Sequence, residues 1–145
     1  MKAKWFRVIG LLAVALVLLF GANGAQAGIG PARAVDGLYT ALNAGQFEQA
    51  VAIFAEDAIV QNRVTARTYQ GGEQILGMLQ GMARPGRQFE IVGLSMVGDT
   101  ITAQVEVSDR GIAWATETVE AVASGEQIQS LTVAAFHLEL WRIRP

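Results

Sequence analysis

The chain has 145 residues, of which 11 are basic and 13 acidic, and its formal net charge is −2. An acidic chain without a basic run is poorly suited to bind nucleic acid, so no nucleic-acid partner is expected. It contains no cysteine and a single histidine, which argues against a zinc or other transition-metal site, and no cofactor is expected. Without disulfides, the fold must be stabilised by core burial.

The first 27 residues have the pattern of a signal peptide. Three basic residues precede an unbroken apolar run of thirteen residues, 8–20, and residues 25–27 form an A-x-A cleavage site. The run is shorter than the roughly 20 residues that span a bilayer as a helix. We therefore expect cleavage and a secreted or periplasmic domain of residues 28–145, with a net charge of −5. The alternative is an uncleaved segment that anchors the domain to the membrane.

Two helices are predicted at the start of the mature domain. The first is expected to begin near Pro31 and to end before Gly45. Its apolar residues recur at helical spacing and line one face: Val35, Leu38, Tyr39 and Leu42. The second has the same spacing over residues 47–54 and is expected to end at residues 56–57. A strand over residues 58–64 and a polar loop should follow.

A third helix and two hairpins are predicted beyond this loop. Gly71-Gly72 opens the helix and Pro85-Gly86 ends it. The apolar residues then alternate, which predicts four strands: residues 89–97 and 101–107, then 114–123 and 128–136. This order predicts one α+β domain, with three N-terminal helices packed on a curved, mostly antiparallel sheet around a cone-shaped cavity.

Four short segments between residues 35 and 135 carry a family resemblance. They are Leu42-Asn43-Ala44-Gly45, Phe54-Ala55-Glu56-Asp57-Ala58, Gly71-Gly72-Glu73-Gln74-Ile75 and Gly125-Glu126-Gln127-Ile128-Gln129-Ser130-Leu131. In this order and spacing they resemble the SnoaL-like branch of the nuclear transport factor 2-like (NTF2-like) superfamily. The resemblance implies a cone-shaped fold around a pocket. It implies no single activity, because this superfamily holds isomerases, cyclases, dehydratases, hydrolases and binding modules.

The ketosteroid isomerases of this superfamily use a tyrosine on the first helix, a protonated aspartic acid on a late strand and an aspartate base. The resemblance places the tyrosine position at Leu38, with Tyr39 one residue away. It places the base at Asn62, an amide that cannot accept the proton, and the second acid near Thr118. All three roles are altered, so this isomerase chemistry is not expected.

Six residues are predicted to line the pocket: Leu38, Tyr39, Phe54, Asn62, Thr118 and Glu120. By strand alternation, Thr118 and Glu120 share one face, and Glu117 lies on the other. The first face carries the aligned acid position and is assigned to the pocket. A buried Glu120 would have a raised pKa and could act as acid or base, whereas an exposed one would belong to the solvated sheet face. Both interpretations stay open.

The catalytic residues stay unknown, and Tyr39, Glu120 and His137 are the candidates. A tyrosine on an apolar helix face is more often a core residue that hydrogen-bonds at its rim. His137 and Glu139 share a strand face with Trp141 and could form an acid–base pair. A surface pair on an edge strand is the preferred interpretation.

Three hypotheses follow from these observations. The preferred one is an exported pocket domain that binds a small, mostly apolar molecule without turnover. The second is an isomerase, cyclase or hydrolase with relocated groups, which uses Glu120 with Tyr39. The third is an interaction module that forms a homodimer through the open sheet face, where Thr102, Gln104 and Glu106 are expected.

Overall fold

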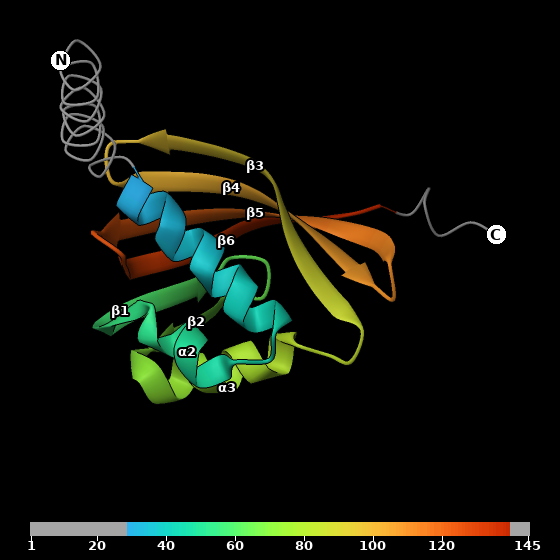
Figure 1. Ribbon diagram of the computed structural model, residues 1–145, viewed down its shortest axis with the longest axis horizontal. Helices are drawn as coiled ribbons and strands as arrows, with labels where there is room; N and C mark the ends of the chain where they lie inside the picture. Colours follow the sequence, from blue (N-terminus) through green and yellow to red (C-terminus); the bar gives the residue numbers. More distant parts are fainter. Residues whose placement is uncertain (1–28, 140–145) are drawn as a thin grey trace, which may run out of the picture.

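A computed structural model describes residues 29–139, in which helices cover the concave side of one curved sheet (Figure 1). The first helix comprises residues 29–43. The elements that follow are α2 (Phe47–Ala52), β1 (Phe54–Asn62), β2 (Arg67–Gln70), α3 (Gly71–Met82), β3 (Arg87–Val97), β4 (Thr100–Asp109), β5 (Ile112–Ser124) and β6 (Gln127–Leu138). The predicted signal peptide and Trp141 lie outside the described residues.

The sheet has six strands in the order β2-β1-β6-β5-β4-β3. Strands β3 to β6 form an antiparallel meander, β1 pairs in parallel with β6, and β2 pairs antiparallel with β1. Tight turns connect the meander, and Gly98 and Gly125 adopt positive φ angles of 60° and 61° there. Glycine adopts this conformation without steric cost. Both predicted hairpins are therefore present, as parts of one continuous meander.

Two expectations for the region before α3 need correction. Helix α2 ends at Ala52, and Phe54 already belongs to β1, where it pairs with Ile128 of β6. Pairing with a distant strand overrides the local helical pattern. The segment Arg67–Gln70, which we expected to be loop, is the edge strand β2. Because β1 and β2 precede α3, the three helices are not all N-terminal to the sheet.

The core lies between the concave face of the sheet and the helices. In β4 the predicted alternation is obeyed, because Ile101, Ala103, Val105 and Val107 are all buried. The first helix buries its predicted apolar face, and α3 buries Ile75 and Leu79. Fully burying one such side chain contributes roughly 1.5–3 kcal/mol, so this shared interior is the main source of stability.

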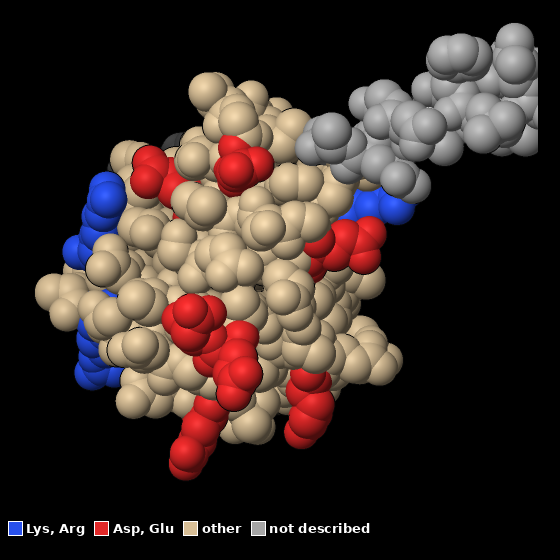
Figure 2. Space-filling model, turned by 90° about the vertical axis from the view of Figure 1, so that its left-hand side faces the viewer, with Lys and Arg blue, Asp and Glu red and all other residues tan. Residues whose placement is uncertain are grey.

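The surface of the described region carries charged side chains among many uncharged residues (Figure 2). Figure 2 shows acidic side chains spread over one face, with basic side chains at its margins. None of the helices described between residues 29 and 139 has the length and apolar character needed to cross a membrane.

Asn43, the last residue of the first helix, joins this helix to the edge strand β3. Its Nδ2 donates to the carbonyl oxygen of Phe89 at 2.8 Å, and its Oδ1 accepts from the Phe89 N–H at 2.8 Å. The Phe89 ring in turn packs on Tyr39, with ring centroids 5.8 Å apart. The segment that carries the family resemblance therefore holds the helix against the sheet.

We expect Asn43→Ala to lower the free energy of unfolding by about 2–4 kcal/mol, because two hydrogen bonds are lost and two half-buried backbone groups lose their partner. Urea unfolding measures the change. The matched control is Gln49→Ala on the exposed side of α2, which should shift stability by less than about 0.5 kcal/mol. Equal effects of the two substitutions would contradict a structural role for Asn43.

Candidate functional site

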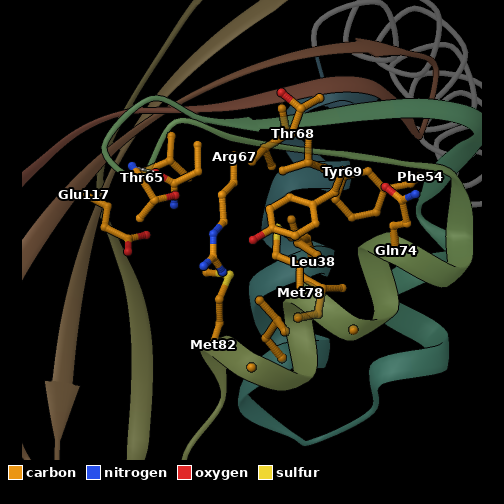
Figure 3. A pocket seen from close by; sticks show the side chains of 18 of the residues that line it. Leu38, Phe54, Thr65, Arg67, Thr68, Tyr69, Gln74, Met78, Met82 and Glu117 are labelled. Carbon is orange, nitrogen blue, oxygen red and sulfur yellow. Dashed lines mark hydrogen bonds between the residues drawn. The ribbon is translucent and has the colours of Figure 1, made fainter.

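A cavity of about 720 Å³ opens between the sheet, the first helix, α3 and the β1–β2 hairpin (Figure 3). Its interior is mostly apolar and is lined by Leu38, Leu42, Phe54, Val60, Met78, Leu79, Met82, Leu131 and Val133. Gly77 and Gly81 of α3 also line it, and a Cβ atom at either position would meet no atom within 4 Å. The missing side chains therefore leave open space along this helix.

Glu117 of β5 is the only carboxylate among the described residues that line the cavity. Its Oε2 atom is buried and has no hydrogen-bond partner in residues 29–139. Burial raises the pKa of Glu117, and the positive charge of Arg87 offsets part of this effect. Burial makes this carboxyl easier to protonate than an exposed one, and in its protonated form it can donate a hydrogen bond.

Tyr39 provides a second hydroxyl donor in the same cavity. The residue is buried, and its hydroxyl has no hydrogen-bond partner in the described part of the chain. Burial, and to a lesser extent the negative charge of Glu117, raises the pKa of Tyr39 far above its ordinary value. The phenol therefore stays protonated, and it is a neutral O–H group.

Arg87 holds the wall of the cavity next to Glu117. Its Nε and Nη2 donate to the Asp109 carboxylate at 2.9 and 3.1 Å, and its Nη1 donates to the carbonyl of Met82 at 3.1 Å. The guanidinium carbon lies 5.2 Å from the ring centroid of Trp114, a cation–π contact. The hydrogen bond from Arg87 lowers the pKa of Asp109. These contacts connect the end of α3 to β3 and β4.

The structure places four of the six predicted pocket residues at the cavity. Leu38, Tyr39, Phe54 and Asn62 line it. The Asn62 side-chain oxygen accepts a hydrogen bond from the Thr65 N–H at 3.0 Å, so this amide orders the β1–β2 turn.

Thr118 and Glu120 do not line the cavity, so the assignment of their strand face to the pocket needs correction. Thr118 hydrogen-bonds with Gln104 at 3.0 Å on the outer face, and Glu120 lies opposite Thr102 and Thr132 there. The inward row of β5 contains Glu117 instead. The aligned acid position was therefore displaced by one residue, which in a strand reverses the side chain.

His137 also lies away from the cavity. It is exposed near the end of β6 and is paired with Thr116 on β5. The Thr116 hydroxyl donates to Glu139 at 3.3 Å. No group of three or more potential metal-ligating side chains occurs among residues 29–139.

The polar residues at the mouth of the cavity were not predicted from the sequence. They are Thr65, Arg67, Thr68, Tyr69 and Gln74. Most of them belong to the hairpin that we expected to be an unstructured polar loop. No apolar alternation marks the short exposed strand β2, so the sequence offers no clear signal for these residues.

Comparisons with known proteins agree with this architecture. The profile of the SnoaL-like domain family matches residues 35–143. No curated protein matches the chain. The chain is similar to an NTF-2 like protein of unknown function from Burkholderia xenovorans LB400, with 15% identity and a TM-score of 0.64 over 78% of this chain and 85% of that chain.

Two other similar structures carry proposed activities. One is a proposed ketosteroid isomerase from Kribbella flavida DSM 17836, with 19% identity and a TM-score of 0.59 over 68% of this chain and 72% of that chain. The other is a proposed polyketide cyclase from Sinorhizobium meliloti, with 22% identity and a TM-score of 0.60 over 68% and 91%. At these identities the likeness shows the fold alone. The NTF2-like α+β fold expected from the sequence is confirmed.

The raised pKa of Glu117 predicts a pH-dependent stability difference between the native protein and Glu117→Gln. The folded protein holds this proton more tightly than the unfolded chain does. Native stability therefore falls as pH rises from the ordinary glutamate pKa, about 4.3, through the raised pKa of Glu117. The glutamine variant lacks this loss, so its stability relative to the native protein should increase across that window.

Urea midpoints measured between pH 4 and pH 8 test this expectation. The matched variant Glu120→Gln, altered on the outer face of the same strand, shows whether any Glu-to-Gln change on β5 has such an effect. A stability difference between native and Glu117→Gln that is independent of pH would contradict burial of an ionisable Glu117.

Proposed function

The chain belongs to the SnoaL-like domain family, and from this premise we propose that it binds a small, mostly apolar molecule in its cavity without converting it. The observation that carries this proposal is the composition of the lining. Apolar side chains form most of the wall, and Glu117 is the only carboxylate among the described residues of that wall. The volume of about 720 Å³ lies within the range of small-molecule pockets.

Glu117 and Tyr39 give this cavity a preference for ligands with an oxygen acceptor. Burial raises the pKa of both groups, which favours their neutral forms that donate hydrogen bonds. A ketone or ester carbonyl satisfies such donors, whereas a purely apolar ligand leaves them unpaired at a cost of about 1–3 kcal/mol each. The ligand is therefore an apolar body with a carbonyl-type oxygen that faces β5.

We propose binding without turnover because of the groups that line the cavity. Moving a proton between two carbons requires a group that accepts it and later returns it. Asn62, which lines the cavity, carries an amide, and the raised pKa values of Glu117 and Tyr39 favour forms that donate a hydrogen bond. No imidazole lines the cavity within the described part of the chain. The set orients a ligand better than it performs proton transfer.

The second candidate function is an enzyme of the isomerase or cyclase type. Two O–H donors in one apolar cavity can stabilise an enolate oxygen, which favours this candidate. In it, Glu117 takes the role that the sequence assigned to Glu120. Catalysis would further require a base, which an ionised fraction of Glu117 could supply.

We also propose that residues 1–27 are removed on export to a secreted or periplasmic location. The basic start, the apolar run and the cleavage pattern of the sequence support this. The mass of the purified protein from the culture fluid or periplasm would begin at Gly28. A mass of the full chain in the membrane fraction would support the anchored alternative instead.

We also propose that two copies of the chain pair through the outer face of the sheet. The outward row of β4 contains Thr102, Gln104 and Glu106, which are half-buried polar residues on an open face. Light scattering of the purified protein would give a dimer mass. A monomer mass at every concentration would contradict it.

Binding of the fluorescent ketone Prodan tests the proposed function, because Prodan combines a naphthalene body with one carbonyl. The native protein should bind one molecule with blue-shifted emission. Glu117→Leu removes one donor and should weaken binding about fivefold, the equivalent of about 1 kcal/mol. Gly77→Phe should weaken it more than tenfold, because its ring fills the cavity, while Gly77→Ala should bind as the native protein does.

An unchanged affinity of Gly77→Phe would show that Prodan binds elsewhere, and this would contradict the proposal. Proton exchange separates binding from catalysis. In D₂O, the bound protein should not accelerate deuterium exchange at the methylene next to the Prodan carbonyl, as followed by NMR. Accelerated exchange that Glu117→Leu abolishes would support the enzyme instead.

A further inference from the structure

The mouth of the cavity contains one positive charge, that of Arg67. This residue begins β2, and its side chain extends into the cavity beside Tyr69 of the same strand (Figure 3). Of the other described arginines, Arg33 and Arg87 form ion pairs with Glu126 and Asp109. Arg67 forms no ion pair within residues 29–139. It is the only cationic residue among those that line the cavity there.

Neutral side chains that can donate hydrogen bonds line the same cavity as this guanidinium. The Thr65 and Thr68 hydroxyls and the half-buried Tyr69 line the same mouth. The Gln74 Oε1 atom accepts the Gln70 N–H at 3.0 Å, which leaves the Gln74 amide N–H groups available to donate. The mouth therefore presents one cation and several donors.

The only carboxylate of the described lining lies on a different element from this mouth. Glu117 is on β5 and makes no ion pair with Arg67. Burial raises the pKa of Glu117, which favours the neutral form that does not repel an anion. The described lining thus holds one cationic group, on β2, and one carboxyl group, on β5.

The chemistry of the Arg67 guanidinium indicates which charged group it can bind. Figure 2 shows acidic side chains on one face of the domain, and that face does not attract anions. Arg67 is exposed overall, and its guanidinium can bind a carboxylate or sulfonate in bidentate geometry. A ligand must therefore present its charge at the mouth.

We infer that the molecule bound by this cavity is an amphipathic organic acid, with its single anionic group on Arg67 and its apolar body against α3 and the first helix. This inference rests on the proposed function, because it assigns a chemical class to the ligand of the same cavity. The apolar body occupies the cavity of about 720 Å³, and an oxygen acceptor on it pairs with Glu117.

A matched pair of fluorescent probes tests this inference. 8-Anilinonaphthalene-1-sulfonate and N-phenyl-1-naphthylamine share one ring system, and only the first carries an anionic group. The native protein should bind the sulfonate at least tenfold more tightly, since a hydrogen bond to a charged group contributes about 1.5–3 kcal/mol. Raising the salt concentration should weaken binding of the sulfonate probe and leave binding of the neutral probe unchanged.

Two arginine variants show whether Arg67 causes the tighter binding of the sulfonate probe. Arg67→Gln should lower the affinity for the sulfonate probe about tenfold and change the affinity for the neutral probe by less than twofold. Arg63→Gln, altered at an exposed position of the same hairpin that does not line the cavity, should change neither affinity. Far-ultraviolet circular dichroism and urea midpoints check that each variant is folded.

The outcomes separate the inference from the proposed function. Equal affinities of the native protein for the two probes, or equal losses for both probes in Arg67→Gln, would overturn the amphipathic acid while an apolar binding cavity remains. A native protein that binds neither probe nor Prodan would overturn both. A tenfold preference that only Arg67→Gln removes would support both.

Discussion

The paired hydrogen bonds between the Asn43 amide and the backbone of Phe89 hold the first helix across the concave face of the sheet. A side-chain amide here bonds to an edge strand as a neighbouring strand would. Phe89 packs on Tyr39, so the same contact sets the position of the residue that brings a hydroxyl into the cavity. Without this connection, the helix would lack a fixed distance from β3, and the cavity would lack a defined width.

The sequence predicted the elements in which burial and local pattern agree. The alternation of β4, the spacing of the first helix and the α3 boundaries at glycine and proline are of this kind. The start of β1 escaped prediction because its pairing with β6, more than 60 residues away, overrides a local helical pattern. Strand β2 escaped because an exposed four-residue edge strand buries almost nothing and so leaves no apolar period.

The site was predicted in part for a related reason. The residues on the first helix and β1 follow from which face is apolar, whereas β5 offers one glutamate on each face. The row of Glu117 contains Ala115, Val119, Ala121 and Ala123, while the row of Glu120 contains Thr116, Thr118 and Val122. The more apolar row faces inward, so the composition of the two rows already favoured Glu117. Counting from the family motif led to the other face.

The Glu117 carboxyl, whose pKa burial raises, is the central polar group of the proposed ligand cavity. The Oε2 atom of this carboxyl is buried and has no hydrogen-bond partner among residues 29–139, and buried polar atoms in proteins are seldom left unpaired. Carbon-13 NMR of the glutamate side-chain carboxyls measures its titration directly, in the presence and absence of saturating Prodan. We expect the Glu117 resonance to titrate above the ordinary range and to shift on binding. A resonance that titrates normally and does not respond to Prodan would contradict the account.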